Sequence, residues 1–337
     1  ERAVIVAITG ASAGVGRATA REFAAHGWDV ALIARGAERL GTAAREVEKH
    51  GARALPIIAD VADYVALDAA AERVERELGP IDVWVNNAMA TVFAPVSEIK
   101  PEEFHRATEV TYLGQVHGTM AALARMRRRN HGTIINVGSA LAYRAIPLQS
   151  VYCGAKFAVR GFTDALRSEL IHDRSKVKLM MVHLPAVNTP QFDWALNRTG
   201  RQTQPLPPIF QPEMPARAIY HAARRPSCRE KWVGFSTVKA ILGNKVAPGL
   251  LDRYLARAGY DGQLTAEPRR TDAPANLFAP VAGEQAAHGR FDARAHDRSE
   301  EMRVSLHPAA TAAAVAGFAL FGAALWRLTR HGEAQGR

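Results

Sequence analysis

A short apolar run that leads straight into a glycine-rich turn constrains this chain more than any other stretch. Residues 3–8 (Ala-Val-Ile-Val-Ala-Ile) predict a strand buried on both faces, as in a parallel sheet. Residues 9–16 carry glycines in the spacing Gly-x-x-x-Gly-x-Gly, and helix-forming residues follow as far as residue 26. One glycine suffices for a strand-to-helix turn, whereas three also let a pyrophosphate approach the helix N-terminus closely. We therefore predict a dinucleotide-binding loop at Gly10, Ser12, Gly14, Val15 and Gly16.

The end of the second predicted strand bears on which dinucleotide binds. Residues 28–35 are mostly apolar and end in Arg35. Folds that bind NAD place an acidic residue here to hold the ribose 2′-hydroxyl, whereas an arginine accommodates the 2′-phosphate of NADP. Arg35, together with Arg39 one helical turn later, therefore favours NADP as the cofactor. The alternative is a surface arginine that merely follows a strand.

Strands and helices alternate through the first 260 residues. Further strands are predicted at 54–59, 82–85, 132–137, 177–184 and 231–235, and helices at 37–50, 63–78, 101–129 and 150–173. This alternation implies βαβ units and a parallel sheet. We predict an α/β protein with a doubly wound, parallel-sheet Rossmann fold, in a single domain over residues 1–260. The proline-rich residues 190–215 predict a mobile or extended flap over the site.

The predicted helix 150–173 carries a tyrosine and a lysine four residues apart. Tyr152 and Lys156 lie on one face of that helix, so the phenol and the ammonium can share a site. A free tyrosine has a pKa of about 10, and a nearby ammonium lowers that pKa, which makes the tyrosine a usable acid/base. The same spacing arises by chance on amphipathic helices. Ser139 strengthens the catalytic interpretation because it follows a strand at the sheet edge where ligands bind.

Together these motifs resemble those of the short-chain dehydrogenase/reductase family, over about residues 2–260. The resemblance is carried by Thr9-Gly10-x-x-x-Gly14-x-Gly16, Asp60-Val61, Asn86-Asn87-Ala88, Ser139 and Tyr152-x-x-x-Lys156. It implies a doubly wound seven-stranded sheet that binds NAD(P), and the interconversion of a carbonyl and an alcohol by hydride transfer. It also implies that Tyr152 is the acid/base, that Lys156 lowers its pKa and holds the nicotinamide ribose, and that Ser139 polarises the substrate oxygen.

The remaining cofactor contacts are implied by the same resemblance. Asp60 and Val61 would hold the adenine, and Asn86 and Ala88 would pack along the cofactor. The other expected cofactor contacts are Asn87, Pro185, Val187 and Thr189, of which Thr189 stands where the family contacts the nicotinamide-side phosphates. Met89 and Ala186 depart from the family pattern, since both stand where the family has a glycine.

Thr111 takes the place of the asparagine in the family's catalytic set. In the family, that asparagine helps bend its helix, and a main-chain carbonyl at its position holds a water next to the active-site lysine. The carbonyl exists with any side chain, so we expect Thr111 to preserve the water contact and count it among the catalytic residues. Its hydroxyl is expected to bond a carbonyl three or four residues back.

Charge and cysteine content restrict the partners. Lys and Arg number 43 against 33 Asp and Glu, which fits nucleic acid, an anionic membrane or a solvated surface that attracts a polyanionic cofactor. We favour the last and expect a small carbonyl or alcohol substrate, no nucleic-acid partner and a homo-oligomer. Cys153, Cys228 and the scattered histidines form no recognisable metal motif, so we predict no metal and a cytoplasmic location.

The composition changes after about residue 260. Residues 261–307 are rich in Asp, Arg, Ala, Pro and Gly and predict a weakly ordered polar arm that wraps the domain, or a linker to the C-terminal residues. Residues 308–328 predict an apolar helix, since 308–326 hold no charge and a spanning helix needs about 20 apolar residues. Alanine is nearly neutral for membrane insertion, so a membrane anchor and a surface or partner-binding helix both stay open.

Two classes of function stay open as well. The first is an NADP-dependent oxidoreductase whose substrate would meet an apolar lining of Leu141, Tyr143, Pro147, Leu148 and the flap. The second is a cofactor-binding sensor or scaffold without turnover that acts through its C-terminal arm. The intact set of serine, tyrosine and lysine favours the enzyme, because folding does not require all three at this spacing.

Overall fold

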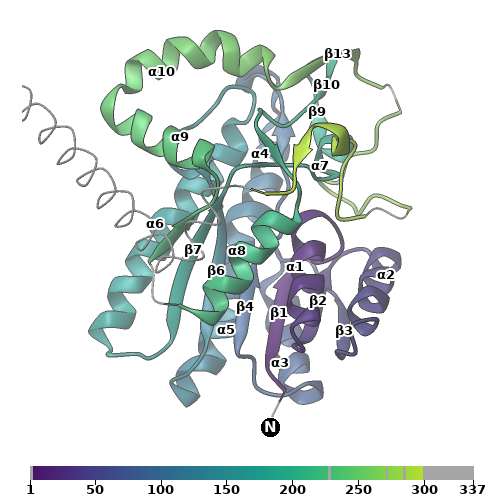
Figure 1. Cartoon of the computed structure of the whole chain (residues 1–337), viewed down its shortest axis with the longest axis vertical. Coiled ribbons are helices and arrows are strands. Elements are labelled where there is room, and N and C mark those ends of the chain that lie inside the picture. The colour runs from purple at the N-terminus through teal and green to yellow at the C-terminus, as the bar shows by residue number, and fades with distance from the viewer. Residues whose placement is uncertain (1–2, 227–228, 271, 284–285, 299–337) are drawn as a thin grey trace, which may run out of the picture. The chain divides into compact units, whose positions relative to one another are not determined.

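The computed structural model describes residues 3–226, 229–270, 272–283 and 286–298. Its first compact unit, residues 1–298, is built on a parallel sheet of seven strands in the order β12-β7-β6-β4-β1-β2-β3 (Figure 1). The strands are β1 (Ile5–Thr9), β2 (Asp29–Ala34), β3 (Ala54–Ile58), β4 (Val83–Asn86), β6 (Thr133–Ser139), β7 (Lys178–Leu184) and β12 (Glu230–Trp232). The doubly wound Rossmann fold predicted from the sequence is confirmed.

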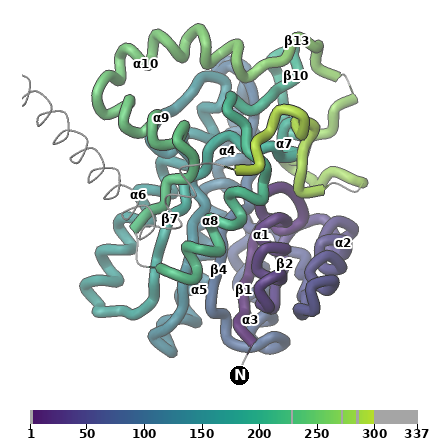
Figure 2. Tube along the Cα trace, in the orientation of Figure 1, coloured from purple at the N-terminus to yellow at the C-terminus, as the bar shows by residue number. Residues whose placement is uncertain are grey.

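Helices form a layer on each face of this sheet (Figures 1 and 2). One group comprises α1 (Gly14–Ala25), α2 (Ala37–Glu48) and α8 (Glu213–Arg224), and the other α3 (Tyr64–Glu77), α5 (Gly114–Arg129) and α6 (Ser150–His172). Because both faces are covered, every residue of β1, β2, β4 and β6 is buried. The strand order reverses between β1 and β4, and ligands of such sheets bind beyond the carboxyl ends of the strands at this point.

A buried polar network joins the middle of the sheet to α5. The Asn86 amide nitrogen donates to the Asn136 side-chain oxygen at 2.8 Å and to the Thr119 hydroxyl at 3.0 Å. Its amide oxygen accepts from the Trp84 indole at 2.7 Å. The expectation that Asn86 packs along the cofactor is therefore wrong, because its side chain is fully committed inside the core.

The long helix predicted over 101–129 is divided into three parts. They are α4 (Pro101–Thr108), a π-helical turn η2 (Glu109–Leu113) and α5. Thr111 lies in the π-turn, where its hydroxyl donates to the carbonyl of Ala90 at 2.6 Å and accepts from the amide of Ala90 at 3.0 Å. The prediction that this hydroxyl bonds a carbonyl of its own helix is wrong. Its partner is the loop after β4, and the extra residue of the π-turn interrupts the helix there.

The proline-rich stretch 190–215 is organised rather than extended. It contains α7 (Gln191–Trp194) and the short strands β9 (Leu196–Asn197), β10 (Arg201–Thr203) and β11 (Ile209–Phe210). Each strand pairs with a distant segment: β9 with β5 (Val92–Phe93), β10 with β13 (Leu264–Pro268), and β11 with both β8 (Ala186–Val187) and β14 (Ala295–His296). These small sheets attach the stretch to the loops above the carboxyl edge of the main sheet (Figure 1).

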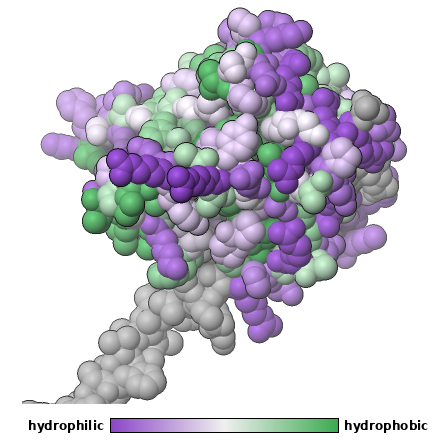
Figure 3. Space-filling model, turned by 90° about the horizontal axis from the view of Figure 1, so that it is seen from above, coloured by the Kyte–Doolittle hydropathy of each residue, from purple (hydrophilic) through white to green (hydrophobic). Residues whose placement is uncertain are grey.

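Two helices, α9 (Phe235–Val246) and α10 (Pro248–Tyr254), follow β12. They expose Val246, Leu250 and Tyr254, while Ile241 is buried. The face that Figure 3 shows from above mixes apolar residues with a larger number of hydrophilic ones. Apolar residues on this pair of helices therefore lie partly at the surface and partly toward the interior.

The C-terminal extension is packed on the domain as far as the structure describes it. Residues 261–298 belong to the same compact unit as the sheet, which agrees with an arm that wraps the domain rather than with a linker. Leu277, Ala287 and Phe291 are buried, which the expectation of weak order did not anticipate. The apolar helix expected at 308–328 lies outside the described residues. None of the helices in the described ranges has the length and apolar character needed to cross a membrane.

Candidate active site

A cavity of about 520 Å³ lies at the carboxyl ends of the central strands. It gathers most residues that the sequence analysis selected from distant parts of the chain. Those that line it are Gly10, Ser12, Gly14, Val15, Arg35, Asp60, Val61, Asn87, Ala88, Ser139, Tyr152, Lys156, Pro185, Val187 and Thr189. Gly16 and Thr111 are not part of the lining. We call the part near Tyr152 the tyrosine end, and the part near Arg35 the arginine end.

The glycine turn brings bare backbone to the cavity. Gly10 and Gly14 have φ angles of +67° and +55°, which side chains rarely adopt, so glycine is needed at both. A β-carbon on Gly16 would lie 2.2 Å from the Gly10 carbonyl oxygen, so Gly16 lets α1 approach the turn rather than lining the cavity. The N-terminus of α1 has no side-chain cap, although the Gly14 amide donates to the Ala286 carbonyl at 3.4 Å. A helix N-terminus at such a turn suits an anion such as pyrophosphate.

Thr9, which the sequence analysis names in the glycine motif without giving it a role, holds the two loops around this turn together. The Thr9 hydroxyl accepts from the amides of Asn87 at 3.0 Å and Ala88 at 3.1 Å. The Asn87 side chain in turn donates to the Thr9 carbonyl at 3.1 Å. These bonds fix the loop after β4 against the loop after β1, where both face the cavity. Thr9 stands directly before Gly10 in the sequence, but its role depends on Asn87 and Ala88, which lie far along the chain.

At the tyrosine end, β6 and α6 bring three reactive side chains together. The Ser139 hydroxyl lies beside the Tyr152 hydroxyl, and its oxygen accepts from the Leu141 amide at 3.1 Å. The Lys156 ammonium donates to the Val137 carbonyl at 2.7 Å and lies 5.4 Å from the centroid of the Tyr152 ring. Ser139 and Val137 are two apart on β6, so both face α6.

Burial governs the protonation of this group. Lys156 is only 2% exposed, and this burial lowers its pKa to about 7. Burial also raises the pKa of Tyr152 above its ordinary value, and the hydrogen bond from Ser139 offsets only part of that rise. The sequence led us to expect that Lys156 lowers the pKa of Tyr152. In this structure the influences on the Tyr152 pKa are desolvation, Ser139 and Cys153, without Lys156, and desolvation is the largest, so the neutral phenol is favoured.

The arginine end is cationic. Arg35 and Arg39 line the cavity, and burial, the leading influence on each, lowers both guanidinium pKa values. Arg106 forms an ion pair with Asp60, so this carboxylate is already engaged beside the predicted adenine position. Asp60 also accepts from the Ala62 amide at 3.0 Å. No acidic residue follows β2 at the position that would hold a ribose 2′-hydroxyl.

The substrate-side lining differs from the expected one. Leu141 lines the cavity, but Tyr143, Pro147 and Leu148 do not. Tyr143 instead donates to Glu230, and burial followed by that carboxylate raises its pKa to about 12. Apolar lining comes from segments without any recognisable motif, and comprises Ile146, Leu206, Ala240, Leu251, Tyr254 and Leu255.

Comparison with known proteins identifies the class. The family model for short chain dehydrogenase matches residues 4–198, more than half of the chain, so the chain belongs to that family. The uncharacterized oxidoreductase YxnA of Bacillus subtilis is 31% identical over 324 residues, which cover 95% of this chain and 90% of that protein. The 3-dehydrosphinganine reductase of Danio rerio is 32% identical over 192 residues, 56% of this chain and 57% of its own length.

Solved structures agree with this assignment. An alcohol dehydrogenase from the archaeon Thermococcus sibiricus, complexed with 5-hydroxy-NADP, is 27% identical and superposes with a TM-score of 0.59. It covers 69% of this chain and 95% of its own. A short-chain dehydrogenase from Streptomyces avermitilis, 26% identical, has a TM-score of 0.63 over 77% of this chain and 96% of its own. Nearly all of each solved chain is matched while much of this chain is not, whereas the YxnA match extends into the C-terminal extension.

Proposed function

We propose that this protein is an NADP-dependent oxidoreductase that interconverts a carbonyl and an alcohol by hydride transfer, with Tyr152 as the acid/base. One observation carries the proposal. The hydroxyls of Tyr152 and Ser139 and the ammonium of Lys156 meet at one end of a cavity whose other end is a glycine turn beside two arginines. Folding alone does not require this combination, which supplies both a proton donor and a nucleotide cradle.

The residues of this chain account for the proton chemistry. When bound, NADP would supply or accept the hydride at the substrate carbon. The hydroxyls of Ser139 and Tyr152 lie beside each other, and both would turn to donate to the substrate oxygen. Tyr152 would give its proton to that oxygen as a carbonyl is reduced, and take it back in the reverse reaction. Lys156, with a pKa near 7, would restore the proton of Tyr152 because it exchanges protons readily near neutral pH.

NADP is favoured over NAD by the arginine end. A 2′-phosphate there would receive charge-assisted hydrogen bonds from Arg35 and Arg39, while a 2′-hydroxyl would find no carboxylate acceptor. The alcohol dehydrogenase of T. sibiricus is described with an NADP derivative, which agrees with this preference. Gly10 and Gly14 leave room for the pyrophosphate next to the N-terminus of α1.

The substrate is proposed to be a largely apolar carbonyl or alcohol. Leu141, Leu206 and Leu251 line the cavity, and Gln149 and Arg144 add polar residues to its lining.

The test is hydride transfer itself. Purified protein is incubated with 4-deuterated NADPH and a panel of ketones, steroids and acyl substrates, and the products are analysed by mass spectrometry. Deuterium at the former carbonyl carbon is the expected result. If the protein binds NADPH tightly but reduces no member of the panel, and also oxidises none of the corresponding alcohols, the sensor or scaffold interpretation is favoured.

A further inference from the structure

A short part of the C-terminal extension lies directly on the arginine end. Within residues 276–281, four backbone carbonyls accept hydrogen bonds from two arginines of the cavity. Arg35 donates to the carbonyls of Asn276 at 2.5 Å and of Leu277 and Phe278 at 3.4 Å each. Arg39 donates to the carbonyl of Val281. Asn276, Pro280 and Val281 themselves line the cavity, so residues 276–281 form part of its wall.

This segment is anchored at its start. The Leu277 side chain is fully buried in the main core, and its carbonyl also accepts from Arg106 at 3.2 Å. The Asn276 amide donates to the Trp194 carbonyl at 3.0 Å, and the Arg39 guanidinium lies 4.7 Å from the Trp194 ring centroid. Leu277 thus holds the segment to the sheet domain, and Trp194 joins it to the second arginine.

The contacts leave the arginines able to bind an anion. Within the described ranges, neither Arg35 nor Arg39 has a carboxylate within ion-pair distance, and the acceptors that they contact here are neutral. A guanidinium carries five N–H donors in a fixed fork, so carbonyls on one side leave donors for the cavity on the other. A phosphate is a stronger acceptor than a carbonyl and matches this fork.

We propose that residues 276–281 are a cofactor clasp: they hold Arg35 and Arg39 toward the 2′-phosphate of NADP and close over the nucleotide, which exchanges only when the clasp opens. The clasp is a specificity-determining element for the same cofactor and rests on the proposed function. It belongs to the C-terminal extension, not to residues 4–198 that match the family model.

A disulfide across the clasp tests the proposal. The β-carbon of Pro280 lies 3.7 Å from the position that a β-carbon on Gly36 would take, within the range of about 3.5–4.5 Å found in disulfides. Gly36 has φ −95° and ψ 114°, which a cysteine adopts readily. The double variant Gly36→Cys/Pro280→Cys is made with Cys228→Ser, so that the buried Cys153 is the sole native cysteine left.

The reduced double variant is loaded with NADPH and oxidised, and NADPH release into excess NADP⁺ is followed by fluorescence. We expect release to slow by at least about tenfold in the oxidised protein and to recover on reduction, because the locked clasp retains its hold on the arginines. The two single-cysteine variants should show no dependence on redox state. An unchanged release rate, with disulfide formation verified by thiol titration, overturns the clasp alone. Failure of the reduced protein to bind NADPH overturns the clasp and the proposed cofactor together.

A second pair of variants decides the matter if the disulfide does not form. Leu277→Ala removes the buried anchor of the clasp, and Leu264→Ala removes a similarly buried leucine from β13, outside the clasp. Leu277→Ala should weaken NADPH binding by about tenfold, the loss of one charge-assisted hydrogen bond, and change NADH binding far less. Leu264→Ala should leave the ratio of the two affinities as it is. An unchanged ratio in Leu277→Ala overturns the proposal, since a general loss of stability affects both nucleotides alike.

Discussion

The tyrosine end and the arginine end of the cavity are built in different ways. Ser139, Tyr152 and Lys156 come from β6 and α6, which lie close together in the chain, and Lys156 is almost fully buried. At the arginine end Arg39 is also buried, and the half-buried Arg35 contacts carbonyls 241 to 243 residues away in the chain. The chemistry at the tyrosine end therefore depends on desolvation within one local part of the chain. Nucleotide binding at the arginine end depends on the attachment of the distant C-terminal extension.

This difference means that damage to the two ends should be separable. A change at the tyrosine end should slow the chemical step and spare nucleotide affinity, because its groups act on the reacting atoms. A change at the arginine end should alter which nucleotide binds and leave the chemical step nearly intact once the site is saturated. Variants at each end, assayed for both turnover and nucleotide affinity, test that separation.

The largest effect is expected from Tyr152→Phe. The variant keeps the ring but removes the proton donor, so turnover should fall by about 10²–10⁴-fold, the usual contribution of a general acid/base. NADPH affinity should change little. Steady-state kinetics on a verified substrate, with NADPH titration by fluorescence, measures both quantities. Near-normal turnover in the variant rules out the catalytic assignment.

Thr111→Val is the companion change. The Thr111 hydroxyl satisfies both backbone groups of Ala90, so valine leaves two buried polar groups without this partner and should lower the free energy of unfolding by about 1–3 kcal/mol. Turnover at a temperature where the variant is folded should fall no more than about tenfold, since the main-chain carbonyl remains. A turnover as low as that of Tyr152→Phe would instead place the hydroxyl in the proton relay.

At the arginine end, Arg35→Ala should remove most of the preference for NADPH over NADH. A charge-assisted hydrogen bond is worth about 1.5–3 kcal/mol, so the preference should fall by about ten- to a hundredfold. Titration of both nucleotides against wild type and variant measures it, with saturated turnover as the control. Equal affinity of the wild type for NADPH and NADH contradicts the assignment of Arg35.

A smaller effect is expected from pH at the tyrosine end. Burial lowers the pKa of Lys156 from 10.5 to about 7, so between these values the unfolded chain holds a proton that the folded chain has lost. The nucleotide-free protein should therefore gain stability as pH rises from about 7 toward 10. Lys156→Met removes this ionisation, and the gain should disappear from its denaturant unfolding curves. A variant that gains as much stability as the wild type excludes a depressed pKa at Lys156.

The tyrosine end could be predicted from the sequence because its signals are local. Tyr152 and Lys156 are four residues apart on one helix, and Ser139 directly follows a strand whose apolar pattern is clear. The glycine turn could also be predicted, because φ angles of +67° and +55° favour glycine and therefore show in the residue type. In each case steric or periodic rules act within a few residues of the chain.

The parts of the fold and site that were not predicted depend on contacts between distant residues, which no local sequence pattern shows. The π-turn at 109–113 involves the pairing of Thr111 with Ala90, 21 residues earlier. Pro147 was predicted to line the cavity but does not. Its carbonyl accepts a hydrogen bond from the Gln263 side chain in the C-terminal extension. The extension itself has little apolar periodicity, yet a few residues such as Leu277 and Phe291 suffice to attach it.

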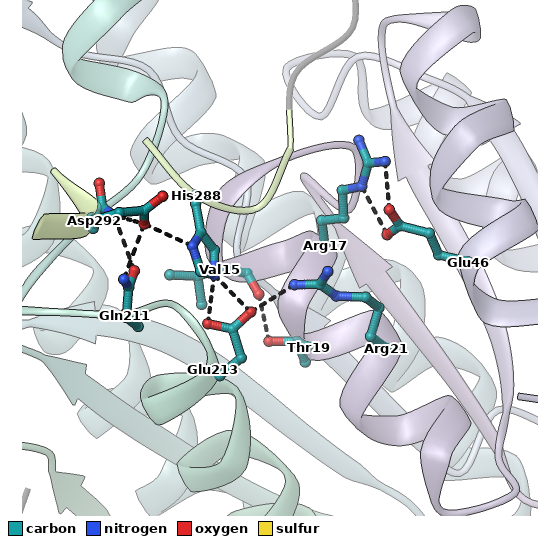
Figure 4. Close-up of polar contacts among 10 residues, drawn as sticks. Val15, Arg17, Thr19, Arg21, Glu46, Gln211, Glu213, His288 and Asp292 are labelled. Atoms are coloured by element: carbon teal, nitrogen blue, oxygen red, sulfur yellow. Dashed lines mark hydrogen bonds and ion pairs between the residues drawn. The ribbon is translucent and has the colours of Figure 1, made fainter. Parts of the chain in front are cut away.

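The smallest effect we predict concerns a histidine that attaches the last part of the extension. His288 lies between two carboxylates, at 2.8 Å from Asp292 and 2.9 Å from Glu213, and Glu213 also pairs with Arg21 of α1 at 2.7 Å (Figure 4). Asp292 further accepts from the Gln211 side chain at 3.0 Å. Only a protonated imidazole donates from both nitrogens, so the arrangement selects the charged form.

Burial alone would lower the pKa of His288, but the hydrogen bonds and charges of Glu213 and Asp292 outweigh it and raise that pKa. A raised pKa stabilises the folded state fully below the unfolded value of about 6.5, and the contribution is lost as pH rises through the folded value. We therefore expect the stability difference between wild type and His288→Gln to be largest at pH 5–6 and to vanish at mildly alkaline pH, in thermal unfolding at matched ionic strength. Arg21→Gln, which removes the neighbouring cation but leaves His288, should keep the pH dependence. A difference that stays constant from pH 5 to 9 would mean that His288 holds the extension by packing rather than by its charge.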